Sequence, residues 1–476
     1  MGKKEKTTKL ISVMVSATLA TGMVPAAAFA QQAVNATGQG GSASSDQSIE
    51  SVDPTATEIA KATEVDTTVG AQLLETETPA SPAMSGDCGA TESDQVTWAL
   101  TQNNDGDENP TYTLTISGEG AMADYSCNIA KSDATQPWRQ GLTGVNVVSI
   151  NNIVVEEGVT SIGAFAFNGV GPSVSHASFD NCLTYKIADS VETIGSWAVQ
   201  SGNVGTWTGA VAEGCKGLMV KDGVLYTKDG SKLIDYPGAA DAVKSFEIPS
   251  GVTEVAAGSF NGCDAENVVF PDGVKNIGGW LFSASTTKSV SFGDGLKSIG
   301  TGAFSGVSTL ENVDFRNEED GLSIGDMAFA TTGLQSVALP AGVTFVGDEA
   351  FKQSPSLSEV IFEGKDTGLS IGKQAFLSCP KLEKVTLPEG VSAVKDQAFQ
   401  NCKGLESVVF GGASNDLVIG SGAFTGTALS SVEFPAGIKE IGSTSFNGLS
   451  TLKTISFAGD VSADGLTIDR YAFQHA

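Results

Sequence analysis

The sequence predicts a repeat solenoid, a right-handed coil of leucine-rich type with a parallel β-sheet on one face and a small β-rich cap before it. Two observations support this prediction. In the C-terminal half an apolar residue is followed five positions later by phenylalanine, as in Ile371 and Phe376, at intervals of 22 to 27 residues. This period is typical of leucine-rich repeats. Between successive phenylalanines runs L-x-x-V-x-L or a close variant, as at Leu382 to Leu387.

The second recurrence predicts a short strand in each coil. Side chains alternate along a strand, so Val385 and Leu387 are expected to face a core while Lys384 and Thr386 face outward. No single coil buries its own apolar face, so neighbouring coils must share one core. The ten phenylalanines in register are Phe260, Phe282, Phe304, Phe329, Phe351, Phe376, Phe399, Phe424, Phe446 and Phe473.

These motifs, I-G-x-x-A-F-x-x-C from Ile371 and L-x-x-V-x-L-P-x-G-V from Leu382, resemble the BspA-like leucine-rich repeat family of bacterial surface proteins. The resemblance extends to the N-terminal module of that family, through LTISGEGAM at 114–122 and Pro137-Trp138, and to a recurring family element at 223–237. It implies a protein that is exported and displayed. Several members are regarded as adhesins, so it also implies an extracellular protein ligand on a host or neighbouring cell.

The first thirty residues predict a secretory signal peptide. Four lysines precede an apolar run from Leu10 to Val24, and cleavage is expected after Ala30. The run is shorter than a spanning helix, which needs about 20 residues, so no membrane insertion is expected after cleavage. Residues 31–85 contain no aromatic side chain and are expected to form a disordered spacer of serine, threonine, alanine and acidic residues.

Residues 86–150 are expected to form the β-rich cap. Alternating apolar residues from Thr97 to Gly118 predict a β-hairpin that closes the first coil. The acidic loop of this hairpin lacks the alternating ligand spacing of a calcium loop, so no metal is expected there. The one disulfide that we consider would join Cys88 to Cys127, and the sequence leaves open whether these two cysteines pair.

Residues 151–254 are expected to contain irregular first repeats, with a second hairpin at about 220–238. This hairpin turns at Asp229-Gly230 and is expected to protrude from the solenoid. Regular repeats are then expected over 255–476. The chain ends just after Phe473 without a closing cap, so we expect the sequence to be truncated at its C-terminus.

Composition excludes several classes of function. The chain has two histidines, and His176 has no nucleophile motif nearby, so no enzyme is predicted. No C-x-x-C pair exists to suggest zinc, and no cofactor is predicted. A net charge of −28 disfavours nucleic acids and anionic membranes. Four cysteines lie three residues after a repeat position that is usually phenylalanine and are expected to fill a buried niche: Cys182, Cys263, Cys379 and Cys402.

The remaining candidate is the outward side of the strands, which carries small hydroxyl and aliphatic residues with few charges. Solenoids bind partners on such extended faces, so the sequence predicts a secreted or cell-surface module for protein interaction or adhesion. A solvent-facing sheet without a partner would have the same composition. The alternative is a structural or glycan-binding envelope component that uses Trp197, Trp207 and Trp280. The candidate partner-binding residues are Asn312, Asp314, Ser336, Glu359, Ile361, Lys384, Thr386, Ser407, Val409, Ser431 and Glu433.

Overall fold

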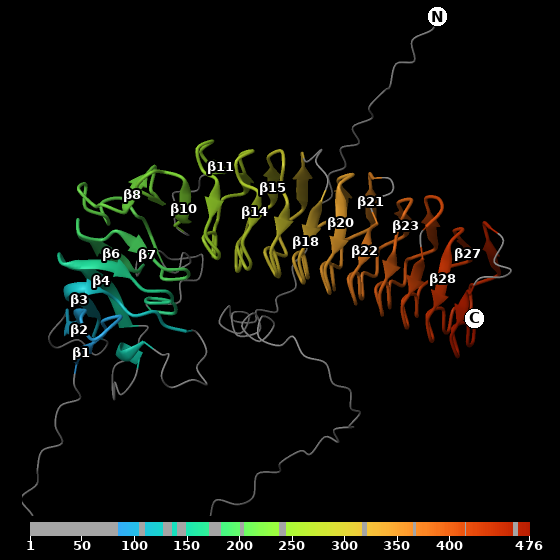
Figure 1. Ribbon diagram of the computed structural model, residues 1–476, viewed down its shortest axis with the longest axis horizontal. Coiled ribbons are helices and arrows are strands. Elements are labelled where there is room, and N and C mark those ends of the chain that lie inside the picture. Colours follow the sequence, from blue (N-terminus) through green and yellow to red (C-terminus); the bar gives the residue numbers. More distant parts are fainter. Residues whose placement is uncertain are drawn as a thin grey trace, which may run out of the picture.

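The computed structural model is an elongated solenoid of stacked coils, with the N-terminal cap at one end (Figure 1). The predicted signal peptide, nearly all of the predicted spacer, Cys127 and His176 lie outside the residues that it describes. The described residues are 84–103, 110–126, 136–139, 149–170, 182–199, 204–237, 244–316, 321–364, 368–414, 416–459 and 465–476.

The cap and the first coils share one seven-stranded sheet with a single core. The predicted hairpin is formed by β2 (Gln95–Gln102) and β3 (Tyr112–Ala121), which pair antiparallel. Strand β3 then pairs in parallel with both strands of the first coil, so the hairpin covers the open end of the solenoid. The other elements are β1 (Ser85–Asp87), η2 (Pro137–Arg139), β4 (Ile150–Val155), β5 (Val159–Ile162), β6 (Thr184–Ile187) and β7 (Thr193–Ile194).

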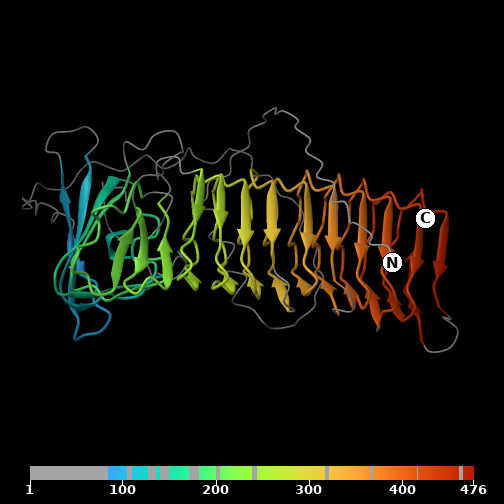
Figure 2. The ribbon, with the colours of Figure 1, turned by 90° about the horizontal axis from the view of Figure 1, so that it is seen from above.

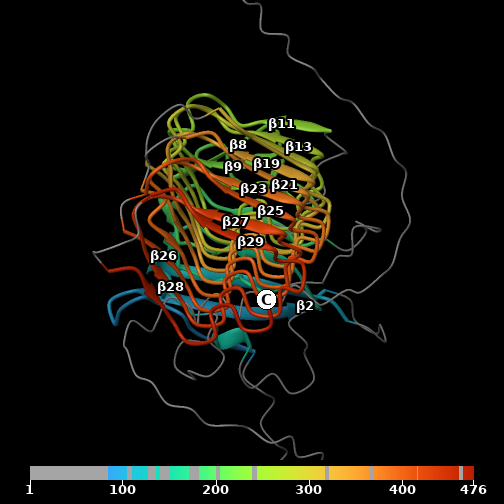
Figure 3. The ribbon, with the colours of Figure 1, turned by 90° about the vertical axis from the view of Figure 1, so that its right-hand side faces the viewer.

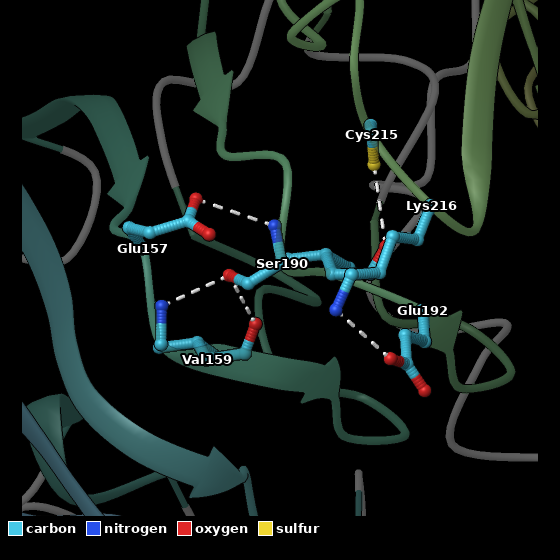
Figure 4. Close-up of polar contacts among 8 residues, drawn as sticks. Glu157, Val159, Ser190, Glu192, Cys215 and Lys216 are labelled. Carbon is cyan, nitrogen blue, oxygen red and sulfur yellow. Dashed lines mark hydrogen bonds and ion pairs between the residues drawn. The ribbon is translucent and has the colours of Figure 1, made fainter.

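Polar contacts tie the early coils together where the repeat pattern is weak (Figure 4). The Ser190 hydroxyl donates to the Val159 carbonyl at 2.8 Å and accepts from the Gly158 amide at 3.0 Å. The Cys215 thiol donates to the Val191 carbonyl at 3.3 Å. Because Ser190 and Cys215 are buried, these bonds satisfy groups that would otherwise destabilise the core.

The second hairpin lies inside the molecule, between two cores. Alternate residues of the hairpin pack on opposite sides: Val224 and Tyr226 on the core of the regular coils, Leu225 on the core of the cap. The expectation that it protrudes was therefore wrong, because both of its faces are apolar and both are covered. Its four-stranded sheet contains β8 (Leu218–Lys221), β9 (Val224–Thr227), β10 (Lys232–Asp235) and β12 (Glu254–Val255).

The regular coils form parallel sheets on two sides of the solenoid (Figures 2 and 3). One side carries the predicted L-x-x-V-x-L strands: β11 (Ser245–Glu247), β13 (Asn267–Val269), β15 (Ser289–Phe292), β17 (Asn312–Phe315), β19 (Ser336–Leu339), β21 (Glu359–Phe362), β23 (Lys384–Leu387), β25 (Ser407–Phe410), β27 (Ser431–Phe434) and β29 (Thr454–Phe457).

The opposite side is a continuous nine-stranded sheet made by the segment before each phenylalanine turn. Its strands are β14 (Asn276–Ile277), β16 (Ser298–Ile299), β18 (Leu322–Ile324), β20 (Val343–Val346), β22 (Ser370–Ile371), β24 (Ala393–Val394), β26 (Leu417–Ile419), β28 (Ile438–Ile441) and β30 (Thr467–Ile468).

The side with the L-x-x-V-x-L strands is divided into three sheets. Strands β11 to β17 form one four-stranded sheet, β19 to β25 form a second, and β27 pairs with β29. From Phe304 onward, long and short coils alternate. The strands β19, β23 and β27 are each followed by a short turn, whereas the strands between them are followed by a longer loop. The two interruptions, after β17 and after β25, each follow such a longer loop.

The ten phenylalanines form one continuous stack through the core. Neighbouring rings from Phe260 to Phe473 have centroids 4.9 to 5.3 Å apart and planes within 20° of parallel. All are fully buried except Phe473, which is half-buried. The predicted register is confirmed, because each ring packs on the equivalent ring of the next coil.

Each phenylalanine turn bends twice through the left-handed backbone region. The residues two before and two after the phenylalanine have positive φ, as Glu349 (+59°) and Gln353 (+56°) do around Phe351. Around Phe304 both positions are glycine. This region costs other residues about 1–2 kcal/mol, so coils without glycine retain backbone strain.

We therefore expect Gln353→Gly to raise the free energy of unfolding by about 0.5–1 kcal/mol, since relief of strain exceeds the added chain entropy of glycine. The side chain of Gln353 is exposed, so little packing is lost. Chemical denaturation would measure the change. The matched control is Gln335→Gly, at an exposed position without positive φ, which should be destabilising. Equal effects of the two changes would contradict this explanation.

Candidate functional site

The candidate site is the outward side of β17, β19, β21, β23, β25 and β27, which we call the outward face. Along each strand the residues alternate between the core and this face, as Val385 and Leu387 are buried while Lys384 and Thr386 are exposed. All eleven residues predicted for partner binding point this way. Ten of them are exposed and Ser407 is half-buried. The structure thus places the predicted residues on the same side of the solenoid, on strands of three neighbouring sheets.

Strand register arranges the central sheet, β19 to β25, into two rows of side chains. Paired residues fall in the same row, since Glu359 pairs with Lys384 and Ile361 pairs with Thr386. We call Ser336, Glu359, Lys384 and Ser407 the polar row. We call Ala338, Ile361, Thr386 and Val409 the aliphatic row, in which every side chain presents a methyl group.

The aliphatic row contains the large hydrophobic side chains that this surface exposes. Ile361 is 42% exposed and Val409 is 41% exposed, on either side of Thr386. The only other large hydrophobic residues with comparable exposure in the described chain belong to its last two coils: Ile455, Ile468 and Tyr471. Ile361 and Val409, together with the methyl groups of Ala338 and Thr386, form a single row across the four strands of the central sheet.

Carboxylates replace aliphatic groups at both ends of this row. Asp314 on β17 and Glu433 on β27 have the register position that Ile361 has on β21. Asp314 forms an exposed ion pair with Arg316, with Nε and Oδ2 3.4 Å apart. Such exposed pairs contribute little to stability. Charge therefore flanks the central sheet, and aliphatic groups cover part of its middle.

The sequence contains the signal for these rows, but the row pattern was not predicted. The side of each strand that faces outward follows from alternation. The grouping into rows depends on how the strands are aligned across longer and shorter loops. Only the observed pairings show that Ile361, Thr386 and Val409 are neighbours.

The predicted tryptophan zone is not an accessible surface. Trp207 is fully buried, and its indole nitrogen donates to Asp235 Oδ2 at 2.7 Å. Trp280 is 7% exposed. Trp197 is half-buried with its ring 6.5 Å from that of Phe165. The expectation that these three rings together offer stacking faces to a glycan is therefore corrected, because their faces are occupied by the protein.

Three of the four cysteines that follow the repeat position occupy the predicted buried niche. Cys263, Cys379 and Cys402 are fully buried, whereas Cys182 is half-buried. Cys379 and Cys402 donate to carbonyls of the preceding coil, at 3.1 and 3.0 Å. Cys88 is also buried, but Cys127 lies outside the described residues, so their pairing stays a prediction.

Burial raises the pKa of the Cys263 thiol to about 12. We therefore expect alkylating reagents at pH 8 to leave Cys263 unlabelled in the folded protein, because the thiolate is the reactive form. Denaturant should restore labelling. Peptide mass spectrometry would measure both states, with half-buried Cys182 as an internal comparison that labels faster. Equal labelling of the two cysteines in the folded protein would contradict the proposed niche.

Among the described residues, no group of three or more histidine, cysteine or acidic side chains is arranged to hold a metal ion. No helix in that part of the chain has the length and apolar character needed to cross a membrane.

A family profile for the BspA type leucine rich repeat region matches residues 239–358 and 369–476, in six copies. This part of the chain is a BspA-type leucine-rich repeat region. The resemblance seen in the repeat motifs is thereby confirmed, whereas the N-terminal module and residues 223–237 lie outside the matched ranges. BspA-type repeats are typical of bacterial surface proteins, and they are a non-enzymatic fold.

Solved bacterial structures are also similar to this chain. A leucine-rich repeat protein from Bacteroides ovatus is 21% identical, with a TM-score of 0.44 over 78% of this chain and 88% of that one. One from Eubacterium ventriosum is 22% identical, with a TM-score of 0.39 over 72% and 95%. A leucine rich cell surface protein from Faecalibacterium prausnitzii is 18% identical, with a TM-score of 0.34 over 79% and 96%. Among curated proteins, none matches the sequence.

Proposed function

We propose that this protein is a secreted or cell-surface module for protein interaction and adhesion, and that it binds its partner through the outward face. The observation that carries the proposal is the pair of aliphatic side chains, Ile361 and Val409, exposed on a hydrogen-bonded parallel sheet. The structure holds them in place through strand pairing rather than through a loop.

The side that carries the L-x-x-V-x-L strands, of which the outward face is a part, is long enough for a protein partner. Ten strands at a spacing of about 4.8 Å make the side with the L-x-x-V-x-L strands about 45 Å long. Its four-residue strands are about 13 Å long, so this side has an area of about 600 Å², and an interface that buries roughly 800 Å² on each partner would cover it and the loops beside it. Neither row of the central sheet contains an aromatic side chain, so a ring-stacking glycan site on this face is disfavoured.

The test measures binding of the purified chain to immobilised extracellular-matrix proteins and, in parallel, to purified cell-wall glycans over a series of salt concentrations. Saturable binding to a protein is expected. The double variant Ile361→Ser with Val409→Ser should weaken it and leave thermal unfolding nearly unchanged, because both side chains are exposed. Binding to glycans alone, or protein binding that the variant retains, would overturn the proposal.

A charge exchange provides a matched second variant. Glu359→Lys with Lys384→Glu keeps the net charge and the pairing of the two positions. It should alter protein binding while changing the free energy of unfolding by no more than about 0.5 kcal/mol, as for most surface substitutions. Unchanged binding in this variant would place the contact away from the polar row.

A further inference from the structure

We propose that the outward face binds an extended segment of a partner protein that runs along the solenoid axis, across the strands. In this arrangement aliphatic side chains of the segment cover the aliphatic row, and a lysine or arginine near each end pairs with a flanking carboxylate. The inference rests on the proposed function and specifies the chemistry of the partner.

The direction of the segment follows from the shape of the aliphatic row. Ala338, Ile361, Thr386 and Val409 lie on four consecutive strands of one hydrogen-bonded sheet, so the row runs perpendicular to the strands. It is one side chain wide, because the polar row lies beside it. A narrow row of this kind fits an extended chain better than it fits a broad apolar surface.

The charges at the ends of the row determine the spacing of the partner's cations. Asp314 and Glu433 are five strand steps apart, on β17 and β27. At about 4.8 Å for each step their separation is about 24 Å. An extended chain rises about 3.3 Å per residue, so two basic residues about seven positions apart would reach both carboxylates.

The two ends are not equivalent. Asp314 shares its charge with Arg316, whereas Glu433 forms no ion pair with any described residue of the chain. Both carboxylates are exposed. A cation on the partner is therefore attracted more strongly to Glu433, which gives the bound segment a preferred end. The aliphatic middle and acidic ends together disfavour a nucleic acid, because phosphates would be repelled at both ends.

The probe is a synthetic peptide with lysines seven positions apart and alternating valine and threonine between them. Fluorescence anisotropy would measure its binding to the full purified chain at low and physiological salt. Two control peptides have glutamates in place of the lysines, or lysines four positions apart. The first peptide is expected to bind, and both controls should bind about tenfold more weakly or not at all.

Variants of the protein test the same contacts from the other side. Glu433→Lys should weaken binding of the peptide about tenfold and remove most of the salt dependence of that binding. Asp314→Lys should have a smaller effect on both. The matched control is Glu440→Lys on β28, in the opposite sheet, which makes the same change in net charge and should leave binding unchanged. Thermal unfolding confirms that each variant is folded.

The outcomes separate this inference from the proposed function. Suppose that the Ile361→Ser, Val409→Ser variant loses binding to matrix proteins, but that peptide binding does not depend on lysine spacing or on Glu433. This result would overturn the inference and leave the proposed function standing. Peptide binding that Glu440→Lys weakens equally would show general charge attraction and would also overturn it. Absence of binding to any protein or peptide would overturn both.

Discussion

Replacing Phe376 by alanine should lower the free energy of unfolding by about 3–5 kcal/mol, the usual cost of truncating a buried phenylalanine. Its ring is fully buried and lies 5.1 Å from that of Phe351 and 5.0 Å from that of Phe399, almost parallel to both. The change leaves a cavity that two neighbouring coils line, and the fixed pairing of β22 with its neighbours limits collapse of those coils. Urea denaturation would measure the loss.

The matched comparison is Phe473→Ala. Phe473 is half-buried and has one stacked neighbour, Phe446 at 5.3 Å, so the loss there should be less than half as large. Hydrogen exchange should locate the damage from Phe376→Ala in adjacent coils, because a solenoid is stabilised by contacts between nearest neighbours. Equal losses at both positions, or damage spread evenly along the chain, would contradict the importance of the stack.

Asp235→Ala is expected to lower the free energy of unfolding by about 2–4 kcal/mol, through an unsatisfied buried donor and a cavity. The Asp235 side chain is 1% exposed and accepts the indole N–H of Trp207 at 2.7 Å. Trp207 in turn stacks on Tyr185, with ring centroids 4.8 Å apart. Because Asp235 lies on the strand between the two cores, its loss should weaken their junction. Thermal and chemical unfolding would both report the change.

A double-mutant cycle isolates the bond itself. Trp207→Phe removes the donor, so adding Asp235→Ala to that variant should cost less than the same change in the native chain. Asp229→Ala, at the exposed turn of the same hairpin, controls for loss of a carboxyl group and should cost less than Asp235→Ala, because its hydrogen bonds to Thr227 and Ser231 are exposed to solvent. Strictly additive losses for Asp235 and Trp207 would contradict the role of the hydrogen bond.

The regular coils could be predicted from sequence because each one repeats the same local pattern. The spacing from Ile371 to Phe376 fixes both the ring stack and the phase of the strand that follows. Alternation along β23 then determines which residues face outward. The same pattern recurs in ten coils, so an irregular residue in one coil does not change the register predicted for the others.

The junction between the cores could not be predicted in this way. Val224, Leu225 and Tyr226 form a continuous apolar run, and nothing local distinguishes a protruding hairpin from one that is covered on both sides. Its position depends on Trp207 and Phe260, which are distant in sequence and belong to different cores. The same long-range packing buries Trp207, so its expected contact with a ligand was wrong.

The interrupted sheet has a mechanical consequence. Backbone hydrogen bonds between coils point along the long axis, so tension between the two ends loads them one after another. On the side with the L-x-x-V-x-L strands, the chain lacks strand pairing between β17 and β19 and between β25 and β27. These two joints should yield first under force. The nine-stranded sheet on the opposite side is continuous across both joints, so the central sheet would part from its neighbours on one side of the solenoid while its coils stay paired on the other, and a partner held there would remain attached.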